Sequence, residues 1–566
     1  MSKIAYYIQI FLHIFVLRSK FLFLIVSFFF LFFLKFFRKK DYSEYNNFFK
    51  NFSLNQNKTN NEKICIHINF YSWLDIQNTI FSFLVVNLIG LRNKNILYFK
   101  TSFLKFVNSK NIFIFELPLN YYSKLSFFYL NTLSNRLLKS SYDEIFNYKY
   151  KNIQCGKYSI SSAIRILRTP EINLKNRRHY IVVKFFLIKS IMLADASINY
   201  LNKNKKIEYA VFNDKSYVGA GELFDQCIHN KIKCIQFVAS YKNNIILLKK
   251  FDESNQNHHP SSISQEIWNK FKLDNLSFKQ KNFLKSEIKS QYENNTWYPS
   301  AGTMVGKKFL DLDSLSNQLN LDRDKKTAII FPHIFWDGTF FFGKDLFKNY
   351  IDWYRETLRA ANENKNLNWI IKSHPSNIIK NNRDNISNNK EEPELTIIKE
   401  LFDNVPNHFR YIGSNSKINT FQLFEFLDYC FTIRGTVGIE AALKNKIVVT
   451  AGTGRYDNRD FTYNFNNKIN YFKFISNLHN FKHTKKNVVK NAEKFAYIAF
   501  ICKTFELNSA NFFFKKDNLA NLNLEIDYNK INSDVKFNNS IKELHNWIDG
   551  KYSDYFKDPI DEWKIL

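Results

Sequence analysis

The sequence predicts an α/β protein that is built around parallel β-sheets. From residue 63 onwards, short apolar runs of strand length alternate with longer amphipathic runs of helix length, and this alternation is typical of β-α-β units. Within residues 326–452, five strand-like runs are separated by four helical ones, which is enough for a complete doubly wound domain. Hydrophobic residues make up 45% of the chain and charged residues 23%, values that exclude a disordered or fibrous protein.

The length of 566 residues predicts several domains or two large lobes, since a domain typically holds roughly 100–200 residues. Shifts in composition mark the expected boundaries. We expect a hydrophobic membrane-associated segment, a polar linker, an N-terminal lobe with an insertion, a C-terminal lobe and C-terminal helices, at residues 1–40, 41–62, 63–300, 301–490 and 491–566, respectively.

The charge of the chain is strongly basic, with 81 Lys and Arg residues against 51 Asp and Glu residues. A basic surface suits nucleic acid, anionic lipid or phosphorylated ligands. Here Lys is spread along the whole chain beside many Asn, Ile and Phe residues, the pattern that A/T-rich codons produce, and no helix-turn-helix or RNA-binding aromatic motif accompanies it. We therefore expect no nucleic-acid partner, and expect anionic ligands and an anionic membrane face instead.

The amino-terminal segment is the most apolar part of the chain. Residues 4–17 carry no charged side chain, and the run FLFLIVSFFFLFFLKFF follows at 21–37. A helix over 21–37 would be about 25 Å long, slightly short of the roughly 30 Å hydrocarbon core of a bilayer. Three interpretations stay open: a single span or short hairpin, a helix lying in the membrane interface, or a buried helix whose Phe content reflects codon bias.

A basic cluster, Lys35 with Arg38, Lys39 and Lys40, follows this apolar run. Basic residues that flank a membrane segment favour the cytoplasmic side. The sequence therefore predicts that the body of the protein lies at the cytoplasmic face of the inner membrane.

The two lobes have strands in regular succession. The N-terminal lobe has predicted strands at 63–70, 95–100, 111–117, 207–214 and 233–238. Residues 239–325 are mostly polar, and are expected to hold an insertion and the crossover between lobes. The C-terminal lobe has predicted strands at 326–335, 368–375, 410–413, 428–433 and 446–452, with helices at 344–364, 393–405, 419–427 and 436–445.

Polar residues gather where the strands of the C-terminal lobe end. These strand ends are Pro332-His333 with Asp337-Gly338, Ser373-His374-Pro375, Arg434-Gly435-Thr436-Val437 and Gly452-Thr453-Gly454-Arg455-Tyr456. Open parallel sheets bind their ligands just beyond the carboxyl ends of the strands. The sequence therefore predicts a ligand site at this edge.

The turn at 434–436 closes a strand and opens a helix. Gly435 permits a close approach of the backbone, and the first N–H groups of the helix, with the Thr436 hydroxyl, form a phosphate site. Glu440 lies four residues on, about 6 Å along the axis, where its carboxylate can accept hydrogen bonds from ribose. The alternative is that Thr436 is only an N-cap and Glu440 only a first-turn acid.

Other candidates come from neighbouring strand ends. Pro375 directs His374 away from helical geometry, so that His374 can donate to a phosphate, and Lys372 adds positive charge if its side chain turns the same way; a polar turn is the alternative. His333 and Asp337 are candidate catalytic residues, although PHIFWDG also fits an ordinary turn. Asp214 ends a strand of the N-terminal lobe and is a candidate general base, with a turn or cap Asp equally possible.

The motifs IIKSHP and DYCFTIRGTVGIEAALKNKIVVTAG resemble those of the GT-B-type enzymes of capsule and surface polysaccharide synthesis, including the capsule Kdo-transferase-like group. The resemblance covers residues 326–456 best and fades in the N-terminal lobe. It implies two Rossmann-like lobes that face a cleft, with an acceptor lobe first and a nucleotide-sugar donor lobe second, and no essential metal. It further implies that His374, Gly435, Thr436 and Glu440 contact the donor, and that Tyr456 covers it.

These observations together predict a glycosyltransferase that passes a sugar from a nucleotide sugar to a glycan or lipid-linked acceptor. The nucleotide sugar is then a substrate, and no cofactor is expected. Expected contacts to the nucleotide sugar are Lys372, His374, Arg434, Gly435, Thr436, Glu440 and Tyr456, with Asp214, His333 and Asp337 as catalytic candidates. The alternatives are polyol-phosphate transfer or nucleotide-sugar epimerisation on the same fold, and a non-catalytic factor for capsule assembly or export.

Overall fold

The structure is a computed structural model. It describes residues 63–66, 80–82, 84–85, 88–89, 122–205, 207–338, 340–383, 391–482, 487–507, 510–515, 520–527 and 539–564, and the single positions 36, 43 and 529. The chain forms two compact units. The first comprises Met1–Val238, Leu248–Gln256 and Leu524–Ser553, and the second comprises Ala239–Leu247, Asn257–Asn523 and Asp554–Leu566.

This division differs from the predicted domains at two places. The second unit takes in most of the polar region 257–300, where the structure has helices α11 (Gln265–Phe271) and α12 (Phe278–Glu293). The carboxyl-terminal region does not stay with one unit, because helix α22 (Asn539–Asp549) belongs to the first and the last residues belong to the second. Strands β11 (Thr504–Glu506), β12 (Ala510–Phe514) and β13 (Leu522–Ile526) also lie in the part for which only helices were predicted.

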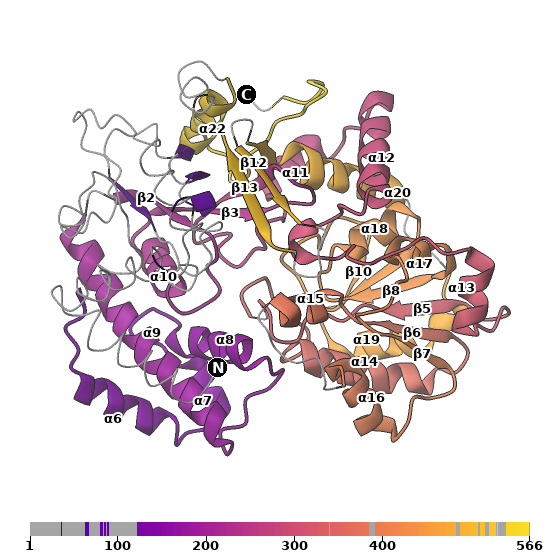
Figure 1. Cartoon of the computed structure of the whole chain (residues 1–566), viewed down its shortest axis with the longest axis horizontal. Coiled ribbons are helices and arrows are strands. Elements are labelled where there is room, and N and C mark those ends of the chain that lie inside the picture. Colours follow the sequence, from indigo (N-terminus) through magenta and orange to yellow (C-terminus); the bar gives the residue numbers. More distant parts are fainter. Residues whose placement is uncertain are drawn as a thin grey trace. The chain divides into compact units, whose positions relative to one another are not determined.

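The second unit contains a six-stranded sheet of order β10-β9-β8-β5-β6-β7. Every pair of neighbours is parallel. The strands are β5 (Thr327–Ile330), β6 (Asn368–Lys372), β7 (Phe409–Ile412), β8 (Tyr429–Thr432), β9 (Ile447–Thr450) and β10 (Tyr463–Asn464). Counted from β5 along the chain, the spatial order is 3-2-1-4-5-6, the order of a doubly wound nucleotide-binding sheet. Figure 1 shows this sheet with its covering helices.

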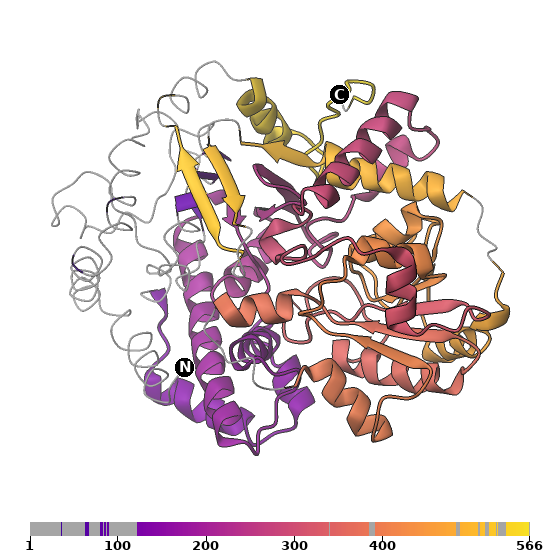
Figure 2. The same ribbon diagram turned by 45° about the vertical axis from the view of Figure 1, so that its right-hand side comes forward.

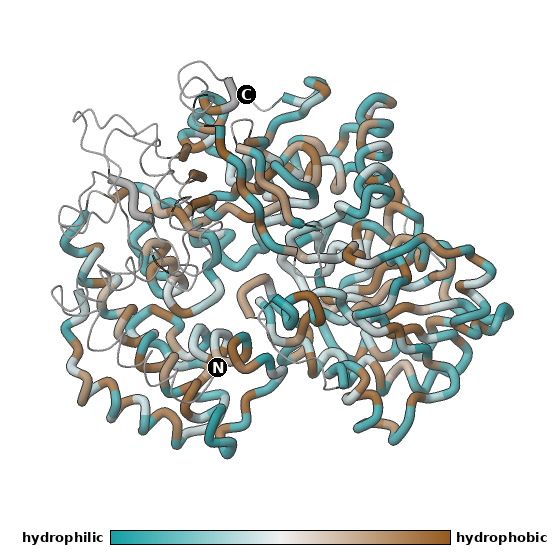
Figure 3. The backbone as a smooth tube through the Cα atoms, in the orientation of Figure 1, coloured by the Kyte–Doolittle hydropathy of each residue, from teal (hydrophilic) through white to brown (hydrophobic). Residues whose placement is uncertain are grey.

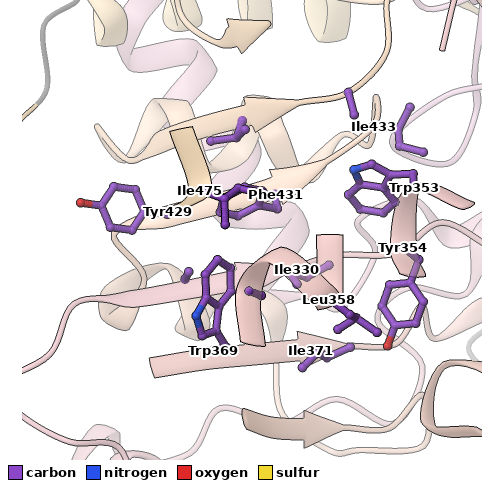
Figure 4. Close-up of a cluster of buried hydrophobic side chains, with 14 of the residues drawn as sticks. Ile330, Trp353, Tyr354, Leu358, Trp369, Ile371, Tyr429, Phe431, Ile433 and Ile475 are labelled. Carbon is purple, nitrogen blue, oxygen red and sulfur yellow. The ribbon is translucent and has the colours of Figure 1, made fainter. Parts of the chain in front are cut away.

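The core of the second unit explains why these runs form strands. Apolar side chains from β5, β6 and β8 pack against helix α14 (Tyr350–Glu363), and the residues labelled in Figure 4 belong to this core: Ile330, Trp353, Tyr354, Leu358, Trp369, Ile371, Tyr429, Phe431, Ile433 and Ile475. Strands that are buried on both faces must be continuously apolar, and β5, β6, β8 and β9 are buried at every position.

The helices of the second unit follow the predicted ones closely. Helices α16 (Pro393–Phe402), α17 (Thr420–Phe426) and α18 (Val437–Leu443) lie inside their predicted ranges. Helix α14 begins six residues later than the predicted 344, because the Asn349 side chain caps it by accepting from the Asp352 N–H at 2.8 Å. An unpredicted helix, α15 (Ser376–Arg383), follows the Ser-His-Pro strand end.

Strands of the first unit pair in parallel within a five-stranded sheet of order β1-β2-β3-β4-β11, in which β4 (Ile245–Phe251) and β11 are antiparallel. Strand β2 (Ile207–Phe212) pairs in parallel with β1 (Lys63–Ile66) on one side and with β3 (Lys233–Ala239) on the other, as the alternation of strands and helices predicted. The predicted strands at 95–100 and 111–117 lie outside the described residues.

The described helices of the first unit include α6 (Phe127–Leu137), α7 (Tyr142–Asn147), α8 (Cys155–Leu167), α9 (Arg177–Lys203) and α10 (Gly221–His229). Helix α8 packs on α7 and α9, and α6 packs on α9, as Figures 1 and 2 show in purple. In Figure 3, hydrophobic and hydrophilic positions alternate along α6, as expected of a helix that buries one face. Helix α9, by contrast, is buried at nearly every position from Val182 to Leu201.

The predicted membrane segment at 1–40 and the linker at 41–62 lie almost wholly outside the described residues. Among the helices that the structure describes, none has both the length and the apolar character to cross a bilayer.

Candidate functional site

The strand order of the second unit reverses between β5 and β8. In a doubly wound sheet, this switch point is where ligands bind, just beyond the carboxyl ends of the two strands. His333 follows β5 and Arg434 follows β8, and the Arg434 backbone N–H donates to His333 Nε2 at 3.2 Å. The structure thus brings together two predicted site residues that lie about a hundred positions apart in the chain.

His333 is held as a neutral ring with its proton on Nδ1. The ring stacks on Tyr350 with 4.8 Å between centroids. Burial, with the positive charge of Arg434 next, lowers the pKa of His333 well below its usual range. Because Nε2 accepts a backbone hydrogen bond, the remaining nitrogen carries the proton. His333 can therefore donate a hydrogen bond through Nδ1, and its catalytic role stays a prediction.

His374 is also held as a neutral ring, but its proton lies on the other ring nitrogen, Nε2. It follows β6, and its Nδ1 accepts from the Ser376 backbone N–H at 3.1 Å, which leaves the proton on Nε2. Burial, with Lys380 and Lys372 next, lowers the pKa of His374 to about 3. The turn that Pro375 imposes thus presents an N–H donor.

Arg434 is committed to protein partners on all three of its nitrogens. Its guanidinium forms an ion pair with Asp345 and donates to Tyr350 Oη and to the Thr453 carbonyl, each at 3.1 Å. Only 3% of the residue is exposed. A direct contact of this side chain with a ligand stays a prediction, and in the structure its role is to hold the neighbouring loop.

The loop that Arg434 holds comprises residues 343–346, and it lies antiparallel to residues 451–453, which follow β9. The Thr453 N–H donates to the Lys344 carbonyl at 2.9 Å, and the Leu346 N–H to the Ala451 carbonyl at 2.9 Å. Gly343 and Gly454 both have positive φ, of 83° and 93°. A Cβ at Gly343 would lie 2.1 Å from the Thr453 carbonyl oxygen, so only glycine permits this approach.

Arg455 is a functional candidate that the sequence placed at a strand end but did not single out. Its Nη1 donates to the Arg434 carbonyl at 3.1 Å, and its guanidinium lies beside Tyr298 and Glu440. The buried Nε has no hydrogen-bond partner among the described residues. The signal that could have found it is its place in the loop that follows β9, the strand next to β8, because ligands bind beyond the carboxyl ends of strands at the switch point.

The turn at 434–437 offers fewer free amides than predicted. The Gly435 N–H donates to Thr432 Oγ1 at 3.2 Å. The first donors into the helix are Gly438, Ile439 and Glu440, so the backbone N–H groups of Thr436 and Val437 have no acceptor in the described part of the chain. A phosphate at this turn would therefore meet two amides.

Tyr456 lies beneath this turn. It is 2% exposed, and its hydroxyl donates to the Gly435 carbonyl at 2.9 Å. This hydrogen bond makes Tyr456 a support of the turn, and the expectation that Tyr456 covers a bound ligand stays a prediction.

Glu440 is buried, with 6% of the residue exposed. The Tyr292 hydroxyl, from the last turn of α12, donates to its carboxylate. Burial raises the pKa of Glu440, and the hydrogen bonds from Tyr292, Trp297 and Thr436 oppose that rise. The predicted ribose contact stays a prediction, and a ribose hydroxyl would have to take the place of Tyr292.

The remaining predicted residues also have partners. Lys372 is buried and donates to the Ser373 carbonyl at 3.0 Å, and burial, with Lys307 next, lowers its pKa to about 7. Asp337 forms an ion pair with Lys380. In the first unit, Asp214 accepts from the Ser216 N–H at 2.9 Å in a turn, the arrangement of the structural alternative. Their predicted roles stay untested.

The groups with a proton to give form one set at this edge, which we call the strand-end cluster: His333, His374, Arg455 and the backbone N–H groups of Thr436 and Val437. The carboxylates nearest to them are engaged by Lys380, Arg434 and Tyr292. A set of preorganised donors suits an anion such as a phosphate, which would share Arg455 with the Glu440 carboxylate beside it. No group of three metal-ligating side chains occurs among the described residues.

Comparison with known proteins gives structural similarities only, since no family model and no curated protein matches the chain. The beta Kdo 2,4 transferase of KpsC from Thermosulfurimonas dismutans is similar over 54% of this chain and 83% of its own, with a TM-score of 0.34 and 9% identity. The UDP-GlcNAc 2-epimerase of Methanocaldococcus jannaschii, in complex with UDP-GlcNAc and UDP, is similar over 54% and 79%, with a TM-score of 0.26 and 14% identity.

The wall teichoic acid polymerase TagF is similar over 64% of this chain and 89% of its own, with a TM-score of 0.23 and 11% identity. These scores are too low for any of the three similarities to carry an argument about this chain. The assignment of the doubly wound sheet rests on its own strand order.

Proposed function

We propose that this chain is a glycosyltransferase of capsule or surface polysaccharide synthesis, which transfers a sugar from a nucleotide sugar to a glycan or lipid-linked acceptor. The observation that supports the proposal is the strand-end cluster at the switch point of the six-stranded sheet. The similarity of IIKSHP and of residues 428–452 to the motifs of capsule glycosyltransferases supplies the reaction class.

The chemistry of the cluster fits a departing nucleotide phosphate. When the sugar leaves, negative charge builds on the phosphate oxygen, and preorganised N–H donors stabilise that charge most where water is excluded. His333 and His374 remain neutral, so their N–H groups can face a phosphate without the cost of burying further charge, and Arg455 supplies the one positive charge. Holding the two substrates in the reactive geometry supplies the remaining acceleration.

The strand-end cluster itself offers no general base. Both imidazoles present a proton, and the accepting nitrogen of each is occupied by a backbone N–H. In this proposal the acceptor hydroxyl loses its proton to a carboxylate, with Asp214 and Asp337 as the candidates that the sequence names.

The donor site is tested by nucleotide affinity. We would measure binding of CMP, CDP, UDP and GDP by calorimetry for the wild type and for His374→Ala. A hydrogen bond to a charged group contributes about 1.5–3 kcal/mol, so His374→Ala should weaken the best ligand by roughly 10- to 100-fold. His408→Ala is the matched control, because His408 precedes β7 at the opposite edge of the same sheet and is also half-buried.

Binding of no nucleotide, or equal loss in both variants, would contradict the donor site and favour a non-catalytic assembly factor. Transfer is then tested with radiolabelled nucleotide sugars and membrane extract. Incorporation of label from CDP-glycerol would favour polyol-phosphate transfer over sugar transfer. Epimerisation of a UDP sugar without an acceptor would favour nucleotide-sugar epimerisation.

A further inference from the structure

Helix α6 of the first unit exposes large aromatic side chains to solvent. Phe128 is 80% exposed and Tyr129 is 47% exposed. The opposite side of the helix is used for packing, since Leu130, Leu133 and Leu138 are buried where α6 packs on α9. A helix at the edge of a folded unit normally places polar residues on its outer face. An outward Phe with most of its surface in solvent therefore indicates a site of interaction.

The outer face of α6 combines this aromatic residue with positive charge. Positions three and four apart lie on one side of a helix, so Phe128 shares its face with Thr132, Arg136 and Lys139, all of them exposed. Lys124 is exposed one turn before the helix. No Asp or Glu occurs in α6. We call Lys124, Phe128, Tyr129, Arg136 and Lys139 the α6 face.

The charge of the surrounding helices has the same sign. Residues 122–205 contain 15 Lys and Arg residues and 4 Asp and Glu residues, a far stronger excess than the 81 against 51 of the whole chain. Of those four acids, Asp195 is buried and accepts from the Lys124 backbone N–H, and Glu144 is bound in a capping box with Ser141. The codon bias of the chain explains many Lys residues, but it does not explain the scarcity of acids in this region.

We propose that the α6 face docks on the surface of an anionic lipid membrane. Aromatic side chains insert at the boundary of headgroups and acyl chains, while Lys and Arg beside them meet the anionic headgroups. A protein partner would need a face of matched shape, whereas a membrane needs only these two chemistries side by side. This contact is separate from the amino-terminal apolar segment, and it does not depend on the proposed transfer reaction.

A local probe tests the proposal in the full chain. We would replace Phe128 by cysteine, attach an environment-sensitive fluorophore, and add vesicles of phosphatidylcholine alone or mixed with phosphatidylglycerol. The cysteines whose side chains the structure describes are buried, and labelled wild type gives the background. The matched control is Phe278→Cys at the start of α12 in the second unit, where Phe278 is 79% exposed.

We expect a blue shift at position 128 with phosphatidylglycerol vesicles, none with phosphatidylcholine alone, and none at position 278. The shift should fall as salt is raised, because the attraction between the surfaces is screened. A probe at 128 that ignores anionic vesicles would overturn the proposal. A probe that is already blue-shifted without vesicles would also overturn it, since another part of the chain would then cover the face.

Charge removal gives a second test that does not alter the aromatic residue. Each basic residue near an anionic surface contributes about a fivefold effect on affinity. The double variant Arg136→Gln, Lys139→Gln should therefore raise the lipid concentration for half-maximal binding by roughly 10- to 30-fold. The control is the double variant Lys285→Gln, Lys289→Gln, which removes two exposed lysines of α12 and should leave the lipid concentration for half-maximal binding unchanged. An equal effect of both double variants would show charge-driven adsorption only and would overturn the α6 assignment.

Discussion

The two units use the same local motif, a strand that ends in a glycine-containing turn before a helix, for different purposes. In the second unit, the turn after β8 and the neighbouring strand ends leave N–H donors without protein acceptors among the described residues. In the first unit, the charged side chains of the turn after β2 have protein partners, although the buried Ser216 hydroxyl has none among the described residues. Asp214 accepts from Ser216, Lys215 donates to the Gln256 carbonyl, and Glu222 accepts from Ser190 and from the Gly219 N–H.

The difference shows that the position of a polar residue after a strand does not by itself indicate a ligand site. What distinguishes the two turns is the surplus of donors over acceptors. Glu222 is fully buried, and burial raises its pKa to about 7, which is the signature of a carboxyl group enclosed by the fold. His333 and His374, by contrast, each use one nitrogen in the fold and keep the other for a partner.

The largest expected effect concerns the two glycines that open these helices. At Gly221 a Cβ would lie 2.0 Å from the Tyr158 ring, whereas at Gly435 the nearest atom, Thr432 Oγ1, would be 2.9 Å away. Overpacking of a core costs about 1–3 kcal/mol, so Gly221→Ala should lower the free energy of unfolding by about 3 kcal/mol and Gly435→Ala by about 1 kcal/mol. Urea denaturation measures both. Equal losses would contradict the view that the first turn is closed and the second open.

A medium effect is expected from one buried lysine in each unit. Burial lowers the pKa of Lys215 and of Lys372 from 10.5 to about 7. Between these values the unfolded chain binds more protons than the folded one, so stability rises with pH by up to about 1.4 kcal/mol per unit for each lysine. Lys215→Met and Lys372→Met should each make the stability less dependent on pH above pH 7.

This prediction is checked by unfolding free energies measured at several values of pH. Lys326→Met is the control, because that lysine is exposed at the amino end of β5, where its Nζ donates to Tyr429 Oη at 3.2 Å. If one of the two buried-lysine variants kept the full slope, its lysine would not be enclosed as the structure has it, and the comparison of the two units would have to be revised there.

The smallest expected effect concerns pH: the affinity for a nucleotide sugar should stay nearly constant. Because the pKa of His374 is lowered to about 3 and that of His333 lies well below its usual range, neither ring gains a proton between about pH 5 and about pH 8. The affinity for a nucleotide sugar, whose phosphates do not titrate there, should vary by less than about twofold in calorimetry over that range. A tenfold loss with rising pH would mean that a charged imidazole binds the ligand.

Much of the second unit could be predicted from the sequence because its strands are buried on both faces. Such strands must be short and continuously apolar, and polar residues must follow them, so the ranges at 368–375 and 428–433 contain β6 and β8. The start of α14 was predicted too early, because residues 344–346 look amphipathic but pair with the end of β9. Only the partner strand decides between these two conformations.

The sequence by itself determined which chemical groups stand at the carboxyl edge of the sheet: two imidazoles, two guanidinium groups, and an acid one turn into a helix. The tertiary structure decided which of them can still bind something. Arg434 is held by Asp345 and Tyr350, and Glu440 by Tyr292, all of them residues far away in the chain. Whether a polar group is free depends on the hydrogen-bond partner that folding brings to it, and no local pattern of residues encodes that partner.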